Sequence, residues 1–146
     1  MPFKKKTLKI IVCTSGGFDP IHPGHIRMFN AAKKLGDKHV VILNGDSWLL
    51  RKKGKCFMTV ADRREVLFNL KSVDDVVILD DGRDDVSAAL ESIRPHIFAN
   101  GGDRTNKNTP EKEICRKLGI KMMFNVGGKK IRSSSELLNK YQRSKA

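Results

Sequence analysis

Aromatic residues and long apolar runs are both scarce in this chain of 146 residues. Only 6% of the residues are aromatic, which is too few for the stacking platforms that proteins use to bind single-stranded nucleic acid. Apolar runs such as residues 40–43 and 76–79 are short, whereas a helix needs about 20 apolar residues to cross a membrane. The sequence therefore predicts no membrane-spanning helix, and it disfavours a nucleic-acid-binding module.

Cysteines are also few, and their arrangement excludes two common roles. Cys13, Cys56 and Cys115 are far apart, and an odd number with no C-x-x-C spacing argues against a disulfide framework or a zinc site. We expect no metal site built by the protein and a reducing, cytoplasmic location. The apolar stretch at residues 10–12 is too short for a secretion signal.

Acidic residues are outnumbered, with 16 against 29 basic residues and a net charge of +13. Much of the excess lies at the ends, since residues 1–9 carry four lysines and residues 129–146 carry six basic residues against one glutamate. Such ends are often solvated tails. A phosphate-rich partner, such as a nucleotide, a sugar phosphate or a nucleic acid, is nevertheless expected.

Strand-like apolar runs alternate with stretches of helical periodicity along the whole chain. Strands are predicted at residues 8–13, 38–43, 76–79, 96–99 and 120–124, and helices at residues 24–35, 59–72, 84–93, 110–118 and 134–141. This alternation predicts an α/β fold, a single Rossmann-like doubly wound parallel five-stranded sheet with helices on both faces. One domain would cover residues 1–146, with short basic tails at both ends.

Glycines and polar residues are concentrated in four stretches, at residues 14–25, 44–47, 100–104 and 127–136. Each stretch directly follows a predicted strand. Because ligands of open parallel sheets bind beyond the carboxyl ends of the strands, we expect these stretches to meet at one edge and form a binding site.

The first stretch has the chemistry of a phosphate site. Its glycines allow a ligand to approach the backbone closely, and Gly24 leads into a helix whose N-terminus favours phosphate. His22 and His25 lie three residues apart at that helix start, where their imidazoles could donate hydrogen bonds to phosphate oxygens. Neither the dinucleotide-binding G-x-G-x-x-G nor the P-loop pattern is present.

Gly17-Phe18-Asp19 followed by His22-Pro23-Gly24-His25 resembles the signature of the nucleotidylyltransferase superfamily with the HxGH motif. That superfamily includes glycerol-3-phosphate cytidylyltransferase, the adenylyltransferase domain of the bifunctional heptose enzyme, phosphopantetheine adenylyltransferase and archaeal FAD synthetase. The resemblance extends from residue 10 to about residue 138. It implies an enzyme that transfers a nucleoside monophosphate from ATP or CTP to a phosphorylated acceptor and releases pyrophosphate.

The resemblance also implies roles for individual residues, which fall into three sets. The catalytic set is His22, His25, Lys53 and Arg63. The nucleotide-binding set is Gly16, Gly17, Phe18, Asp19, Gly24, Lys55, Gly102, Asp103, Ser133, Ser134 and Ser135, and the acceptor-binding set is Asn44, Asp46 and Trp48. Mg²⁺ would be bound mainly through the nucleoside triphosphate, and a homodimer is compatible with the resemblance.

Simpler interpretations exist for several of these residues. Asn44 to Ser47 could form only a turn, because Asn-Gly is a common turn pair. Trp48 could be ordinary packing, and Arg63 could be a solvated arginine. Ser133 to Ser135 could serve as a helix cap, which is compatible with a phosphate cradle.

The acceptor is predicted from two local features. Residues 100–104 (Asn-Gly-Gly-Asp-Arg) resemble the "GGD" of the heptose enzyme, and the arginine of the cytidylyltransferase motif "RTEGIST" has no clear counterpart in residues 125–132. We therefore expect a sugar-phosphate or polyol-phosphate acceptor, with adenylyl transfer favoured over cytidylyl transfer. FMN or phosphopantetheine is the alternative acceptor, and a basic nucleic-acid-binding module without turnover is the alternative of another class.

Overall fold

The computed structural model describes residues 9–102, 109–128 and 133–144. Within these residues, five parallel strands form one sheet in the order β3-β2-β1-β4-β5. The strands are β1 (Ile11–Gly16), β2 (Lys38–Asn44), β3 (Asp75–Leu79), β4 (Ile97–Ala99) and β5 (Lys121–Met123). The predicted five-stranded, Rossmann-like parallel sheet is confirmed.

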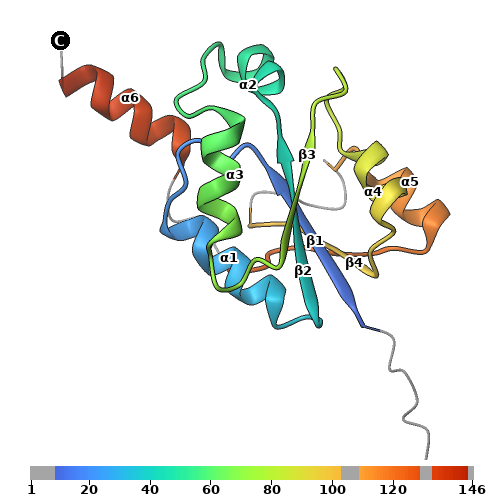
Figure 1. The fold of residues 1–146 in the computed structure, drawn as a ribbon. Coiled ribbons are helices and arrows are strands. Elements are labelled where there is room, and N and C mark those ends of the chain that lie inside the picture. The colour runs from blue at the N-terminus through green and yellow to red at the C-terminus, as the bar shows by residue number, and fades with distance from the viewer. Residues whose placement is uncertain (1–8, 103–108, 129–132, 145–146) are drawn as a thin grey trace, which may run out of the picture.

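Helices cover both faces of this sheet, as Figure 1 shows. They are α1 (Pro23–Lys33), α2 (Asp46–Lys53), α3 (Val60–Phe68), α4 (Ser87–Ile93), α5 (Lys112–Leu118) and α6 (Ser134–Ser144). α1 and α3 pack on one face, α4 and α5 lie on the other, and α6 extends away from the sheet (Figure 1). None of the helices in the described residues has the length and apolar character needed to span a bilayer.

The inner strand β2 shows why the sheet needs helices on both sides. Val40 and Ile42 belong to the apolar cluster that includes α4 and α5, whereas Val41 and Leu43 belong to the cluster that includes α1 and α3. Successive strand residues point to opposite faces, so an uninterrupted apolar run satisfies both layers. This pattern is typical of a strand buried in a parallel sheet.

Helix α2 was not predicted from the sequence. Residues 44–47, for which a simple turn was the alternative interpretation, instead lead into a helix with Gly45 as its N-cap and Gly54 as its left-handed C-cap at φ 75°. Only Leu49 is buried on this helix, so its sequence has no apolar stripe to reveal it. Asp46 in the first turn and three basic residues in the last turn match the helix dipole.

Other element boundaries differ by a few residues from those predicted. β1 begins at Ile11 and continues to Gly16, so the first polar residues after the predicted strand still belong to the sheet. α5 begins at Lys112, after a turn in which the Lys112 N–H donates to the Thr109 carbonyl at 3.3 Å. The helix predicted at residues 110–118 therefore begins two residues later than expected.

β1 and β4 are neighbours in the sheet, yet the chain leaves them toward opposite sides. From β1 it continues to α1 and β2 on one side, and from β4 it continues to α5 and β5 on the other. Such a topological switch point opens a crevice at the carboxyl ends of the two strands. The fold thus places a binding site beyond Gly16 and Ala99.

Candidate active site

A cleft of about 350 Å³ lies at this switch point. Its walls come from β1 and the following loop, the start of α1, α2, the residues after β4, the residues after β5 and the start of α6. The lining residues are 15–18, 22, 24, 25, 27, 28, 53, 99–102, 126–128 and 133–135. Three of the four predicted polar stretches therefore meet at one edge of the sheet, while residues 44–47 do not line the cleft.

Two histidines form one wall of the cleft. His22 is the N-cap of α1, and its Nδ1 accepts the N–H of Gly24 at 3.1 Å. The Nδ1 of His25 accepts the N–H of His22 at 3.2 Å, and the two rings stack with centroids 3.7 Å apart. Because each Nδ1 is an acceptor, a neutral ring carries its proton on Nε2. The pair therefore offers two ring N–H donors at the positive end of a helix dipole.

Phe18 holds the ring of His25 from behind. It is 5% exposed, and its ring meets that of His25 edge-on at a centroid distance of 4.9 Å. Its backbone has a φ of 51°, in the left-handed region that costs a non-glycine residue about 1–3 kcal/mol. A Cβ on Gly16 would lie 2.9 Å from the Phe18 ring, so the glycine makes room for this aromatic support.

The beginning of α6 closes the cleft on another side. The Ser134 hydroxyl donates to the carbonyl of Pro20 at 2.7 Å, and the Ser133 hydroxyl accepts the N–H of Glu136 at 3.3 Å as a cap. Ser135 also lines the cleft. Two helix N-termini, those of α1 and α6, thus face one space, which is an electrostatic arrangement suited to phosphate.

The residues after β4 and β5 approach the cleft through their backbone. Gly101 and Gly102 line it, and so does Gly127, which has a φ of 87° and where a Cβ would lie 2.8 Å from the Cα of Met28. Only glycine permits that close approach of the loop to α1. Asp103, the carboxylate predicted to bind nucleotide, lies outside the described residues.

The predicted basic residues are separated by the structure. Lys53, in the last turn of α2, lines the cleft. Lys55 is partly buried and is not among the lining residues. The adjacent Lys52 forms an ion pair with Asp84 at 3.5 Å instead. Of these lysines, Lys53 is the one placed to neutralise a phosphate group in the cleft.

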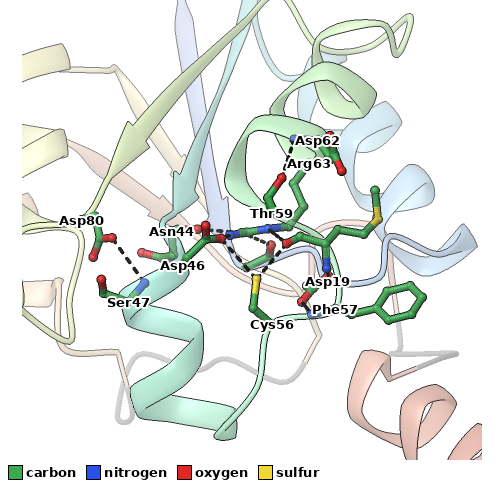
Figure 2. A network of polar contacts seen from close by, with 12 residues as sticks. Asp19, Asn44, Asp46, Ser47, Cys56, Phe57, Thr59, Asp62, Arg63 and Asp80 are labelled. Atoms are coloured by element: carbon green, nitrogen blue, oxygen red, sulfur yellow. Dashed lines mark hydrogen bonds and ion pairs between the residues drawn. The ribbon is translucent and has the colours of Figure 1, made fainter.

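Arg63 does not line the cleft, and the solvated alternative is also wrong, because the residue is only 1% exposed. Its guanidinium donates to three main-chain carbonyls and to the carboxylate of Asp46 (Figure 2). Arg63, which the resemblance assigned to catalysis, therefore binds other segments of the protein. Neither periodicity nor spacing distinguishes these two uses of an arginine.

Three further site residues also make internal contacts. The Asp19 carboxylate accepts the N–H groups of Phe57 and Met58 at 2.6 and 2.7 Å. Asn44 is 5% exposed and gives its carbonyl to Arg63. Trp48 is half-buried and lies beside Gly17. None of the three predicted acceptor-binding residues, Asn44, Asp46 and Trp48, is among those that line the cleft.

Asp46 is charged at neutral pH. Partial burial raises the pKa of its carboxyl, but hydrogen bonds from Arg63 and Cys56 and the charge of Arg63 outweigh that effect and lower the pKa below its ordinary value. The carboxylate is therefore a charged partner of Arg63 at 2.8 Å.

All three cysteines have raised pKa values. Burial raises the pKa of Cys13 to about 12 and that of Cys115 to about 11. Burial and the hydrogen bond with Asp46 raise the pKa of Cys56 to about 11. The three thiols are therefore protonated at neutral pH, whereas the thiolate is the reactive form. In the ranges that the structure describes, no three His, Cys, Asp or Glu side chains are grouped to hold a metal ion.

An open parallel sheet with a switch-point cleft, paired imidazoles and two helix N-termini is suited to binding a phosphorylated ligand. The chain belongs to the cytidylyltransferase-like family, whose model matches residues 13–138. It is similar to the FAD synthase of Aciduliprofundum boonei, with 39% identity over 76% of this chain and 73% of that protein. The FAD synthase of Ferroglobus placidus is 40% identical over 78% of this chain and 72% of its own length.

Proteins with other names also match this chain. The bifunctional protein HldE of Geobacter metallireducens is 32% identical over 93% of this chain, which spans only 28% of HldE. Among solved structures, a lipopolysaccharide core biosynthesis protein from Thermoplasma volcanium superposes with a TM-score of 0.66 and 31% identity, over 80% of this chain and 93% of that one. The relatives of this chain therefore include FAD synthases as well as proteins of other names.

Proposed function

We propose that this cleft transfers the adenylyl group of ATP to the phosphate of a small phosphomonoester and releases pyrophosphate. The observation that carries the proposal is the stacked pair of His22 and His25 at the start of α1, whose rings each accept a backbone N–H through Nδ1. That arrangement orients two imidazoles that line the cleft, and such preorganisation is what stabilises charge in a transition state.

The reaction needs no general base. An oxygen of the acceptor phosphate, already an anion, attacks the α-phosphorus of ATP and forms the new P–O bond. The bond from the α-phosphorus to the bridging oxygen breaks, and pyrophosphate leaves with that electron pair. Catalysis then consists of positioning and of stabilising charge on phosphoryl oxygens. His22 and His25 would supply the donors, and Lys53 would supply a positive charge.

Magnesium would enter with the nucleotide. Mg²⁺ prefers oxygen ligands and usually keeps several waters while it is bound to substrate phosphates. The lining of the cleft offers mostly glycine, histidine and serine, which is not a carboxylate cage for this ion. The protein would therefore recognise the triphosphate with its metal already attached.

Adenylyl transfer is proposed over cytidylyl transfer because of the relatives. Two FAD synthases of 39% and 40% identity cover more than two thirds of both chains, and their named product contains an adenylyl group. The arginine of the cytidylyltransferase motif has no clear counterpart in residues 125–132, of which 129–132 lie outside the described ranges. ATP is thus the first nucleotide to test.

A sugar or polyol phosphate is the proposed acceptor. Apart from the histidines, Phe18 is the one aromatic residue among the described residues of the lining, and it is buried beneath His25. A flat isoalloxazine would have little aromatic surface to stack on there, whereas backbone groups and serine hydroxyls suit a hydroxylated acceptor. FMN is the second candidate, favoured by the identity with the FAD synthases.

The test is pyrophosphate release with ATP or CTP against three acceptors: sugar 1-phosphates, polyol phosphates and FMN. We expect turnover with ATP and a sugar or polyol phosphate, with one nucleoside-diphospho product formed for each pyrophosphate. Turnover confined to FMN would replace the proposed acceptor and leave adenylyl transfer in place. Failure with every pair, together with RNA binding that persists above physiological salt, would favour the nucleic-acid-binding alternative.

A further inference from the structure

Arg63 is the largest fully buried side chain of the described residues, at 1% exposure, and all of its guanidinium nitrogens are engaged (Figure 2). Nε donates to the carbonyl of Met58 at 3.0 Å. Nη1 donates to the carbonyls of Gly17 and Asn44, each at 2.7 Å. Nη2 donates to Asp46 Oδ1 at 2.8 Å. One side chain of α3 thus binds three other segments of the chain.

The position of these partners explains why an arginine is needed. Gly17 follows β1 and Asn44 ends β2, so their carbonyls lie where two neighbouring strands of the sheet part. An unpaired buried carbonyl is costly, and the planar fork of arginine can reach several acceptors in fixed directions. A lysine offers one compact charge and cannot reproduce the fork.

Asp46 extends this network along α2. It begins the helix, and its Oδ1 also lies 3.2 Å from the Sγ of Cys56, two residues beyond the Gly54 cap. Both ends of α2 are therefore fastened at one carboxylate. Residues 17–25, which contain both cleft histidines, are called the histidine loop. In this loop the Asp19 carboxylate accepts the N–H groups of residues 57 and 58. These hydrogen bonds connect the loop between α2 and α3 to the histidine loop.

We propose that Arg63 is a positioning residue: acting through Asp46, it holds α2 against the histidine loop and so places Lys53 in the cleft. The proposal rests on the proposed function, because its effect on the reaction passes through Lys53. It differs from the sequence-based expectation that Arg63 contacts the phosphates itself. Arg63 is not among the residues that line the cleft, whereas Lys53 is.

A double-mutant cycle separates these two roles. Arg63→Lys keeps the positive charge but removes the planar fork of hydrogen-bond donors. Lys53→Ala removes the side chain through which Arg63 is proposed to act. A misplacement of about 1 Å can reduce turnover on the order of a hundredfold, and we expect a loss of that order in kcat/KM for Arg63→Lys. If Arg63 acts through Lys53, the double variant is no worse than Lys53→Ala alone. Losses that multiply in the double variant would overturn the proposal.

The control is the next residue of the same helix. Arg64 lies over the ring of Phe68, with its Cζ 5.3 Å from the ring centroid, and is exposed. Arg64→Lys makes the same chemical change and should leave kcat/KM within about twofold of the wild type. If Arg63→Lys does not fold, Asp46→Asn, which preserves the shape of its side chain, takes its place in the cycle.

A second readout needs no turnover. Trp48, the single tryptophan, is on α2 beside Gly17, so its fluorescence reports how α2 lies against the histidine loop. Arg63→Lys and Asp46→Asn should increase quenching by acrylamide, and Arg64→Lys should not. Unchanged quenching in both network variants would overturn the proposal. If the wild type transfers no nucleotide, the proposed function fails, and this measurement still decides whether Arg63 holds α2.

Discussion

Lowering the pH below about 6.5 should destabilise the protein through one buried residue, His39. Its side chain is fully buried on β2, and its Nδ1 lies 2.7 Å from the carbonyl of Ser72. A carbonyl can only accept, so Nδ1 carries the proton. Nε2, at 2.8 Å from Thr14 Oγ1, then accepts the hydroxyl proton. A second ring proton, on Nε2, would force that hydroxyl to turn so that its oxygen accepts, and it would place a positive charge in a buried site.

Burial lowers the pKa of His39 below its ordinary 6.5, although the hydrogen bond to Ser72 and the charge of Asp74 act in the opposite direction. The unfolded chain therefore takes up a proton first as the pH falls. The contribution of neutral His39 to the free energy of unfolding is fully present above pH 6.5. It decreases as the pH falls from that value to the lowered pKa of His39 in the folded protein. For one proton the loss is at most about 1.4 kcal/mol of unfolding free energy per pH unit.

His39→Asn tests this origin of the pH dependence. The amide can keep the bond to Ser72 but leaves the buried Thr14 hydroxyl without its acceptor, which should cost about 1–3 kcal/mol at neutral pH. In return, the loss of stability between about pH 7 and pH 5 should become shallower. The exposed His96, whose Nδ1 accepts the N–H of Ile11 at 3.0 Å, provides the control variant His96→Asn.

The assay is urea unfolding, followed by Trp48 fluorescence, at a series of pH values from about 8 to about 5. Asp46 and Asp74 also have lowered pKa values, because hydrogen bonds and neighbouring positive charge outweigh partial burial at each carboxyl. Their contributions are lost only at more acidic pH, near and below the ordinary carboxyl value of 3.8. An equal pH dependence in the wild type and His39→Asn would refute the reasoning.

Three further tests concern the walls of the cleft and the basic N-terminal end. Ser134→Ala removes the hydroxyl that bonds the histidine loop at 2.7 Å and should lower kcat/KM by the equivalent of about 0.5–1.5 kcal/mol, measured by pyrophosphate release. Gly127→Ala should lower the melting temperature more than Gly128→Ala, because both positions have a positive φ but only the first would press a Cβ against Met28; equal shifts would contradict the close packing. Deletion of residues 1–6 should leave turnover intact and weaken salt-sensitive RNA binding in a titration, and lost turnover would show that these residues serve the reaction.

The arrangement of the cleft could be predicted because it follows from topology. Carboxyl ends of parallel strands meet at one edge, so three of the four polar stretches after the predicted strands reach the cleft although their boundaries were only approximate, while residues 44–47 do not line it. The histidine pair could be predicted from its own spacing at a helix start. These features depend on local sequence and on one general rule of sheet geometry.

Helix α2 and the role of Arg63 could not be predicted in this way. α2 buries one apolar residue, so periodicity gives no signal, and the pattern Asn44-Gly45 favours a turn. Arg63 occupies a helix position typical of a solvated residue, yet the ends of two strands fold around it. Its partners are 5, 17, 19 and 46 residues away in sequence, and only the tertiary structure brings them together.

The central claim is that the paired imidazoles stabilise the transfer of a nucleotidyl group. The most direct measurement is the single-turnover rate at which label passes from the α-phosphate of ATP to the acceptor, compared between the wild type and His25→Asn. The asparagine oxygen can keep the contact with the His22 N–H that Nδ1 now makes, while the Nε2 donor is lost. We predict a decrease on the order of a hundredfold or more with little change in melting temperature. A transfer rate near that of the wild type would contradict the account.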